Sequence, residues 1–339
     1  MAKAGLLPVV AAAIVLASLS TVVTASETSA TDWLERMGSA INNTSYRGVF
    51  VYTRGQTVHS MQIAHRFEDG MVQERLVLQD GGTGEIVRRG MNVVCVLPER
   101  GRVRLNEVIP SGPFAKASTS QVMPVGRWYH TELKGEGRVA GYEVVVISLT
   151  ARDEHRYSHR LWLEKSTGLL VKSNVREADG DVLEQFQFTS LQITDDIPDS
   201  EFEIRMEGKQ LSRTLDKNSG RKNTGKSSSP ASGRTSGWTL GWRPDGFVPA
   251  ATPRAGEGRA VAFSDGLAAF SVFVEPAGRV EMPTGVSRIG ATTVYMRRLE
   301  QGNTGFLVTI VGEVPPETAR RVAESVEVDP AFALGGDKP

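Results

Sequence analysis

The residues with the best spacing for metal chemistry are His155 and His159, two of the five histidines in this chain of 339 residues. On a helix, two residues at this spacing share one face and could hold a metal ion. The stretch from Arg156 to Leu163, however, alternates between polar and apolar residues as a strand does. Along a strand the two side chains lie roughly 13 Å apart. Nothing nearby in the sequence supplies a third ligand, so no metal site is predicted.

Three other signals for chemistry are weak. "GEGRVA" at 135–140 matches a dinucleotide-binding pattern that requires a helix after it, but the strand-like "YEVVVISL" follows. Ser264 and Asp265 stand in a tight turn without a base, which argues against a hydrolase. Cys95, the only cysteine, lies between valines and is expected to pack as a small hydrophobe. The sequence therefore predicts neither an enzyme nor a cofactor.

One helix is expected at the start of the folded region. Trp33, Leu34, Met37 and Ile41 recur at helical spacing, and Thr31 is the expected N-cap. From about residue 46 the hydrophobic period falls to two. Short runs such as "GVFVYTR", "MQIAHRF" and "NVVCVLP" are each bounded by Gly, Asp-Gly or Pro. This pattern predicts a meander of antiparallel strands to about residue 193, interrupted by a loop or short helix at 110–126.

Length and composition indicate two domains behind a targeting segment. Residues 1–25 combine Lys3, an apolar run at 6–19 and a small-x-Ala cleavage site at 23–25. They predict a cleaved signal peptide, with a membrane anchor as the alternative. Residues 26–207 are then expected to form an N-terminal domain. A flexible basic linker at 208–237, a C-terminal domain at 238–333 and a tail at 334–339 complete the predicted organisation.

The predicted linker holds most of the uneven charge in the chain. Lys plus Arg and Asp plus Glu both count 39, so the net charge is zero. Residues 208–237, rich in Ser, Gly and Lys, contain seven basic residues and one acidic residue. We interpret them as a plain linker, with a basic arm that orders on an anionic partner as the alternative. A nucleic-acid-binding protein would carry such charge on a folded face, so nucleic-acid binding is not expected.

The C-terminal domain is predicted to be a small sheet with one helix. "AVAFSDGLAAFSVFVEP" predicts two strands around a Ser-Asp-Gly turn, and a hairpin is expected through residues 301–303. A closing helix is expected over residues 315–328. Its single apolar stripe must pack on the sheet and comprises Ala319, Val322, Ala323 and Val326.

The apolar positions of the strands in the N-terminal domain allow two interpretations. A strongly curved sheet has a concave face, and partial covering by helices would leave a hydrophobic cavity there. Alternatively, the same side chains fill the core, and periodicity alone does not separate the two. The candidates for lining a lipid cavity are Phe50, Tyr52, Met61, Ile63, Leu161, Leu163, Phe186 and Phe188.

A longer set of motifs resembles a known family. The first half carries Arg-Val-Ala-Gly at 138–141, Leu-Trp-Leu at 161–163, Thr-Gly-Leu at 167–169 and Val-Leu-Glu-Gln-Phe at 182–186. The second half carries Phe-Ser-Asp-Gly-Leu at 263–267, Ser-Val-Phe-Val-Glu-Pro at 271–276 and Gly-Glu-Val-Pro at 312–315. In this order they resemble the RseB/MucB family of periplasmic regulators of the envelope-stress (sigma-E type) response. Glu164 departs from the pattern, where the family usually has Asp.

The resemblance implies a mostly β (α+β) fold. The large domain would be a curved, unclosed antiparallel half-barrel with plugging helices, like the lipoprotein carriers of the periplasm, followed by a smaller α/β domain. The resemblance also implies binding to the periplasmic segment of a single-pass membrane anti-sigma factor, which shields that segment from the initiating protease. Mislocalised lipopolysaccharide or lipoprotein acyl chains would promote release.

Contact with the partner is expected on the small domain. The candidates are Asp265, Gly266, Phe270, Phe273 and Glu275, with the core as the alternative place for the two phenylalanines. Exposed apolar strands would also permit a homo-oligomer. A periplasmic lipid or lipoprotein carrier is the alternative function, favoured by the expected fold of the large domain alone.

Overall fold

The computed structural model describes residues 29–79, 84–90, 92–97, 125–214, 237–249, 260–277, 283–302 and 304–329. The predicted signal peptide, the tail and nearly all of the predicted loop at 110–126 lie outside these residues. Residues 215–236 of the predicted linker also lie outside them. The described part is mostly β, as the sequence predicts.

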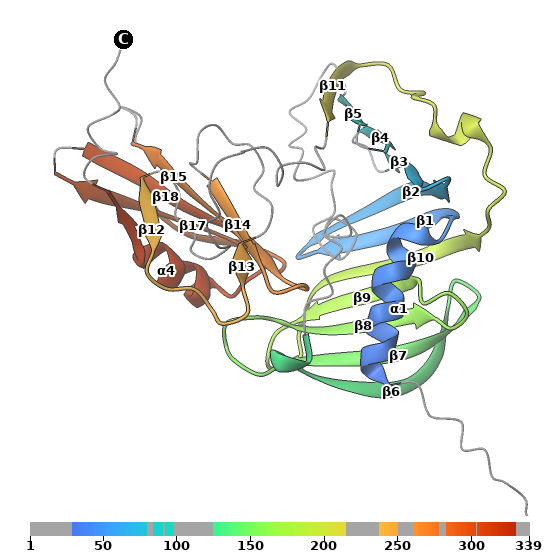
Figure 1. Cartoon of the computed structure of the whole chain (residues 1–339), viewed down its shortest axis with the longest axis horizontal. Coiled ribbons are helices and arrows are strands. Elements are labelled where there is room, and N and C mark those ends of the chain that lie inside the picture. The colour runs from blue at the N-terminus through green and yellow to red at the C-terminus, as the bar shows by residue number, and fades with distance from the viewer. Residues whose placement is uncertain are drawn as a thin grey trace, which may run out of the picture.

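Eleven strands form one antiparallel sheet in the order β11-β5-β4-β3-β2-β1-β10-β9-β8-β7-β6. Among the described residues, the end strands β11 and β6 do not pair with each other, so the sheet is curved but unclosed (Figure 1). The strands are β1 Tyr46–Arg54, β2 Thr57–Glu68, β3 Met71–Leu78, β4 Glu85–Arg89, β5 Asn92–Leu97, β6 Tyr129–Val139, β7 Tyr142–Ala151, β8 Ser158–Glu164, β9 Leu170–Arg176, β10 Val182–Ile193 and β11 Lys209–Thr214. Short 3-10 turns stand at Val125–Arg127 and Asp199–Phe202.

Two of the tight turns in this sheet show why the meander could be read from the sequence. Asp69 and Gly70 join β2 to β3 with φ angles of 51° and 76°, and Ala140 and Gly141 join β6 to β7 with 47° and 88°. Paired positive φ angles are the mark of the two-residue turns whose twist matches that of a hairpin. The dinucleotide-like "GEGRVA" is therefore part of a strand and its turn.

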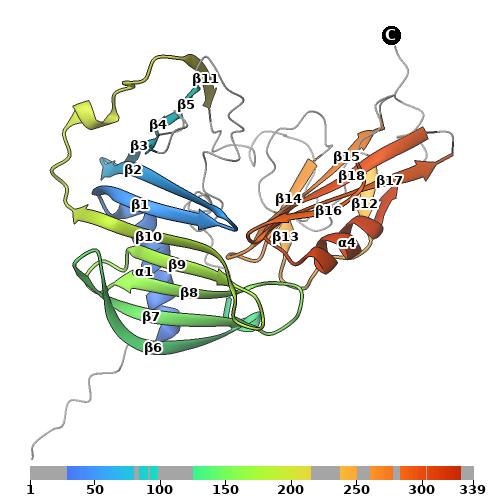
Figure 2. The same ribbon diagram turned by 180° about the vertical axis from the view of Figure 1, so that it is seen from behind.

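Helix α1 (Ala30–Asn43) crosses one face of the large sheet, in front of it in Figure 1 and behind it in Figure 2. Its buried residues include Trp33, Leu34 and Met37, as predicted. The predicted N-cap, Thr31, is wrong, because the helix begins at Ala30 and its N-cap is Ser29. The Ser29 hydroxyl accepts from the Asp32 amide at 3.2 Å, and the Asp32 carboxylate accepts from the Ser29 amide at 3.0 Å. This reciprocal capping box satisfies two amides that would otherwise lack partners.

The C-terminal part is a second sheet of six strands, in the order β13-β14-β15-β18-β17-β16. The strands are β13 Val248–Pro249, β14 Ala260–Ser264, β15 Ala269–Pro276, β16 Gly285–Ile289, β17 Thr292–Gln301 and β18 Thr304–Gly312. Helix α4 (Pro316–Glu324) and a two-stranded sheet of β12 (Trp238–Leu240) and β19 (Val326–Val328) complete it. Phe263, Phe270, Ile310 and Val322 lie in one core, so α4 packs on the sheet as predicted.

Two segments differ from the sequence-based expectation. Val326 was expected on the closing helix, but α4 ends at Glu324 and Val326 begins the strand β19, where it is still buried in the same core. The predicted linker begins at residue 208, whereas Lys209–Thr214 forms β11 and pairs antiparallel with Asn92–Leu97 of β5. The large sheet therefore continues into the range that composition assigned to the linker.

Candidate binding surfaces

The eight candidate cavity residues share one face of the large sheet and are all buried. Cross-strand pairing brings Phe50 opposite both Phe188 and Met61, and Tyr52 opposite Phe186. The three phenylalanine rings lie within 5.0–5.8 Å of one another, centroid to centroid. They therefore contact one another as a packed aromatic cluster on the face that carries α1.

Helix α1 covers the neighbouring part of that face. Leu161 and Leu163 belong to one hydrophobic cluster with Trp33, Met37 and Ile41 of the helix. The sequence thus correctly placed these residues on one face of the sheet. In the structure they pack against one another and against α1. A role in lipid binding stays a prediction.

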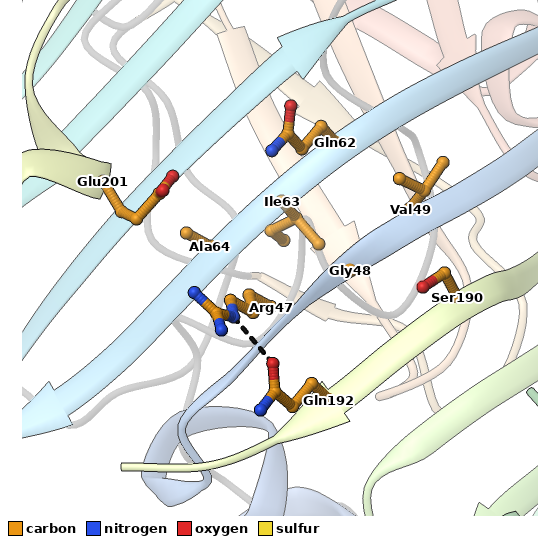
Figure 3. A pocket seen from close by; sticks show the side chains of 9 residues that line it. All are labelled: Arg47, Gly48, Val49, Gln62, Ile63, Ala64, Ser190, Gln192 and Glu201. Atoms are coloured by element: carbon orange, nitrogen blue, oxygen red, sulfur yellow. Dashed lines mark hydrogen bonds between the residues drawn. The ribbon is translucent and has the colours of Figure 1, made fainter. Parts of the chain in front are cut away.

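A pocket of about 300 Å³ opens on the opposite face of the same sheet (Figure 3). Arg47 lies on the face of β1 opposite to that of Phe50. Its Nε donates to Gln192 Oε1 on β10 at 2.9 Å. Glu201 faces the pocket from the turn at Asp199–Phe202. The lining is Arg47, Gly48, Val49, Gln62, Ile63, Ala64, Ser190, Gln192 and Glu201. Of the eight cavity candidates, Ile63 alone borders this pocket.

A buried ion pair joins the two sheets. Arg156 Nη1 lies 2.8 Å from Asp265 Oδ2, and both side chains have no exposed surface. Asp265 also accepts from the Tyr129 hydroxyl at 2.8 Å, and Arg156 donates to Asp153 at 3.0 Å. Burial lowers the pKa of the Arg156 guanidinium, but its bonds to Asp153 and the attraction of Asp265 outweigh burial and raise it. The Arg156 guanidinium therefore stays charged although it is buried between the two domains.

The turn around Asp265 is built by its own side chain. Asp265 Oδ1 accepts from the amides of Leu267 at 2.9 Å and Ala268 at 2.7 Å. Ser264 donates through its hydroxyl to the Ala268 carbonyl at 2.9 Å. The side chains of Ser264 and Asp265 therefore stabilise the turn through hydrogen bonds.

A second polar contact joins the sheets around Glu184 of β10. Its carboxylate accepts from the Ala291 amide of the β16–β17 turn at 2.9 Å and from the Tyr52 hydroxyl, and it pairs with Arg54 Nε at 3.3 Å. Gly290 makes this approach possible, since a Cβ there would lie 2.8 Å from Glu184 Oε1. Burial raises the pKa of Glu184; the bond from Tyr52 opposes that rise, and nearby Glu313 adds to it.

The partner-binding candidates fall into two groups. Asp265 and Phe270 are buried, with 0% and 1% of their surface exposed, the first between the domains and the second in the core of the small sheet. Phe270 therefore takes the alternative place given for it, the core, whereas the Asp265 side chain is buried in its ion pair with Arg156. Gly266 and Glu275 are exposed and Phe273 is half-buried, so a partner can reach these three.

The two histidines and the cysteine that were considered for chemistry pack against other parts of the chain. His155 packs against Trp242 with ring centroids 5.1 Å apart, and His159 against Tyr129 at 5.8 Å. Burial raises the pKa of the Cys95 thiol. Among the residues described, no three His, Cys, Asp or Glu side chains gather in a way that could hold a metal ion. The same part of the chain contains no helix of the length and apolarity needed to cross a membrane.

Comparison with known proteins decides the family. The model of the MucB/RseB N-terminal domain matches residues 29–206, and that of the MucB/RseB C-terminal domain matches residues 232–327. The chain belongs to the MucB/RseB family. The resemblance inferred from the motifs is thereby confirmed.

Relatives in this family span nearly the whole chain. The sigma factor AlgU regulatory protein MucB of Pseudomonas aeruginosa is 34% identical over 94% of this chain and 97% of its own length. The sigma-E factor regulatory protein RseB of Escherichia coli is 28% identical over 87% and 89%. A crystal structure of MucB in complex with MucA(peri) matches with a TM-score of 0.66 and 31% identity, over 88% of this chain and 99% of that chain.

In this family member, the contact at Glu184 makes stability depend on pH. Because its folded pKa is raised, the folded chain holds a proton that the unfolded chain loses above about 4.3, the ordinary carboxyl value. The free energy of unfolding is therefore expected to fall as pH rises from there through the raised pKa. Glu184→Gln should flatten this decline, as measured by chemical denaturation at a series of pH values. Parallel curves for variant and wild type would contradict it.

Proposed function

We propose that this chain is a periplasmic regulator that binds the periplasmic segment of a membrane-spanning anti-sigma factor and shields it from the initiating protease. The observation that carries the proposal is the match to MucB in its complex with MucA(peri), which extends over 88% of this chain and both domains. Named relatives are sigma factor regulatory proteins. The same two domains in the same order support the same function for this chain.

The arrangement of the domains supports a binding role. Arg156 and Asp265 tie the domains together without exposing a charge, and Glu184 reaches the small sheet at a second point. A partner therefore meets one composite surface rather than two independent modules. Domains held in a fixed orientation lose less entropy on binding than domains that must be ordered at that moment.

We further propose that lipid promotes release by acting on the α1 face of the large sheet. Phe50, Phe186 and Phe188 supply apolar surface there, but they are packed together and beside α1. An acyl chain would enter by moving these groups apart. If that rearranged form binds the partner less well, partner and lipid weaken each other by the same factor.

Protease protection tests the proposal. The mature chain would be mixed with the purified periplasmic segment of the host's anti-sigma factor, and cleavage by the initiating protease followed with time. Protein at about ten times Kd leaves roughly a tenth of the segment unbound, so cleavage should slow about tenfold. Unchanged cleavage at saturating protein would overturn the regulatory function.

Lipopolysaccharide fragments would be added in a second arm of the same experiment. Restored cleavage would support a lipid site coupled to the partner site. Protection that persists with lipid would overturn the sensing step and leave the binding function intact.

A further inference from the structure

Strand β16 (Gly285–Ile289) is an open edge of the small sheet. It pairs with β17 on one side, and no other strand of the described chain pairs with its second side. All five residues are exposed, and Val286 and Ile289 expose 57% and 58% of their surface. An exposed edge with apolar side chains is a template on which another chain can add a strand.

The other end strands of the two larger sheets, where their side chains are described, are protected. At the far end of the small sheet, β13 has only two residues, and one of them is Pro249. Along β6, the edge of the large sheet, charged side chains such as Lys134, Glu136 and Arg138 are exposed. Short length, proline and charge are the usual means of blocking an edge. The one charged side chain of β16, Arg288, is instead held by Glu177 of the N-terminal domain.

The register of β16 shows which backbone groups remain open. A two-residue turn joins β16 to β17, so Ile289 and Thr292 close it as a hydrogen-bonded pair. Because such pairs alternate along an antiparallel ladder, Ser287 and Gly285 also bond to β17. The amides and carbonyls of Val286 and Arg288 therefore point away from the sheet, towards the position of an added strand.

The open edge continues onto the surface of the N-terminal domain. A Cβ placed on Gly55, in the β1–β2 turn, would lie 3.9 Å from Ile289 Cγ2. The Gly55 amide donates to the Leu183 carbonyl at 3.3 Å, beside Val182. Val58 of the same hairpin and Val182 expose 60% and 49% of their surface. The elements of the N-terminal domain that approach Ile289 thus carry exposed aliphatic side chains of their own.

We infer that β16 is the docking edge for an extended stretch of the anti-sigma factor's periplasmic segment, which pairs with Val286 and Arg288 and continues over the domain junction. The inference rests on the proposed function and names its site. The stretch that fits presents an apolar side chain to each face of the edge, since Val286 is the exposed apolar side chain on one face and Ile289 on the other. Continuity with the interface between the domains favours this occupant, because a bound strand would touch both domains only while they are docked.

Binding of the fluorescently labelled segment to the full chain tests the edge. Val286→Pro removes an outward amide without touching a bond to β17, and we expect it to weaken binding more than tenfold. Val286→Thr, which keeps the amide, is the matched control and should stay within threefold of wild type. Ile289→Ser should weaken binding, whereas Leu133→Ser, at an exposed position on β6, should not.

The outcomes separate the site from the function. If wild type fails to bind the segment, the proposed function fails. If wild type and Val286→Pro bind equally, the function stands and the edge is wrong. A change in sedimentation of the chain alone, with segment binding intact, would overturn the inference in favour of pairing between two copies.

A second measurement avoids the variants, in case proline unfolds the small sheet. Hydrogen exchange of the wild-type chain would be followed with and without the segment. Slower exchange at the amides of Val286 and Arg288 is expected on binding. Unchanged exchange there, with the segment bound, would overturn the site.

Discussion

Replacing Arg156 with methionine is expected to lower the free energy of unfolding by about 3–5 kcal/mol, the cost of stranding one member of a buried ion pair. The Asp265 carboxylate would keep only the Tyr129 hydroxyl and its own turn as partners, in a site with no exposed surface. The Arg156 guanidinium also lies over the rings of Trp128 and Phe247, 5.3 Å and 5.1 Å from their centroids, and methionine loses this cation–π attraction as well. Chemical denaturation of the full chain measures the loss.

A double-mutant cycle assigns the loss to the pair. Asp265→Asn keeps an acceptor for the turn and removes the charge, so the variant carrying both substitutions should lose less than the sum of the single changes. Arg320→Met is the matched control, because Arg320 pairs with Glu317 and Glu324 on the exposed face of α4. It should leave the denaturation midpoint unchanged. Additive losses in the cycle would show that the pair is not coupled.

The same variant should loosen the arrangement of the domains. Arg156 lies in the N-terminal domain and Asp265 in the C-terminal domain, 109 positions apart in sequence. Small-angle scattering is expected to report a larger radius of gyration for Arg156→Met than for wild type. If partner binding spans the junction, the variant will also bind the segment more weakly, since docking must first be restored.

Local signals explain how much of the fold could be predicted. The capping region, the alternation of the strands and turn pairs such as Asp69-Gly70 each act within a few residues, and their outcomes follow from backbone sterics. Errors arose where two local signals competed. Thr31 is an acceptable cap, but Ser29 followed three residues later by Asp32 forms the reciprocal box, and that pattern was present in the sequence.

Several strands were not revealed by the sequence, most of them short, and β11 lay in the range that composition assigned to the linker. β12, β16 and β19 have three to five residues, too few for a period to stand out, and β16 is wholly exposed. Val326 continues the spacing of the α4 stripe and is buried in the same core, although it belongs to a strand. The burial of Val326 was therefore predicted correctly, but its place in a helix was not.

The contacts between the domains had no signal in a single sequence. Asp265 stands in one of the family motifs, yet nothing local pairs it with Arg156, 109 positions away in the chain. The same holds for Glu184 and the Ala291 amide, 107 positions apart. Alternation did place Phe50, Phe186 and Phe188 on one face, because that inference needs only the register of neighbouring strands.

Replacing Phe188 with alanine separates the two interpretations of that face. Phe188 exposes 1% of its surface and contacts Phe50, Phe186 and Tyr46 with ring centroids 5.2–5.8 Å apart. For a side chain packed in this way, we expect the free energy of unfolding to fall by about 3–5 kcal/mol, from lost transfer energy and the cavity left behind. Denaturation of the full chain in the absence of lipid gives the value.

Met71→Ala provides the control in the same domain. Met71 exposes 48% of its surface at the β2–β3 turn, so its loss should change stability by no more than about 0.5 kcal/mol. A loss below about 1 kcal/mol for Phe188→Ala would contradict close packing and indicate a ring that borders open space. With the expected large loss, a fatty acid below its micelle concentration should restore part of the stability of Phe188→Ala, because a ligand that fills the new cavity binds only the folded state.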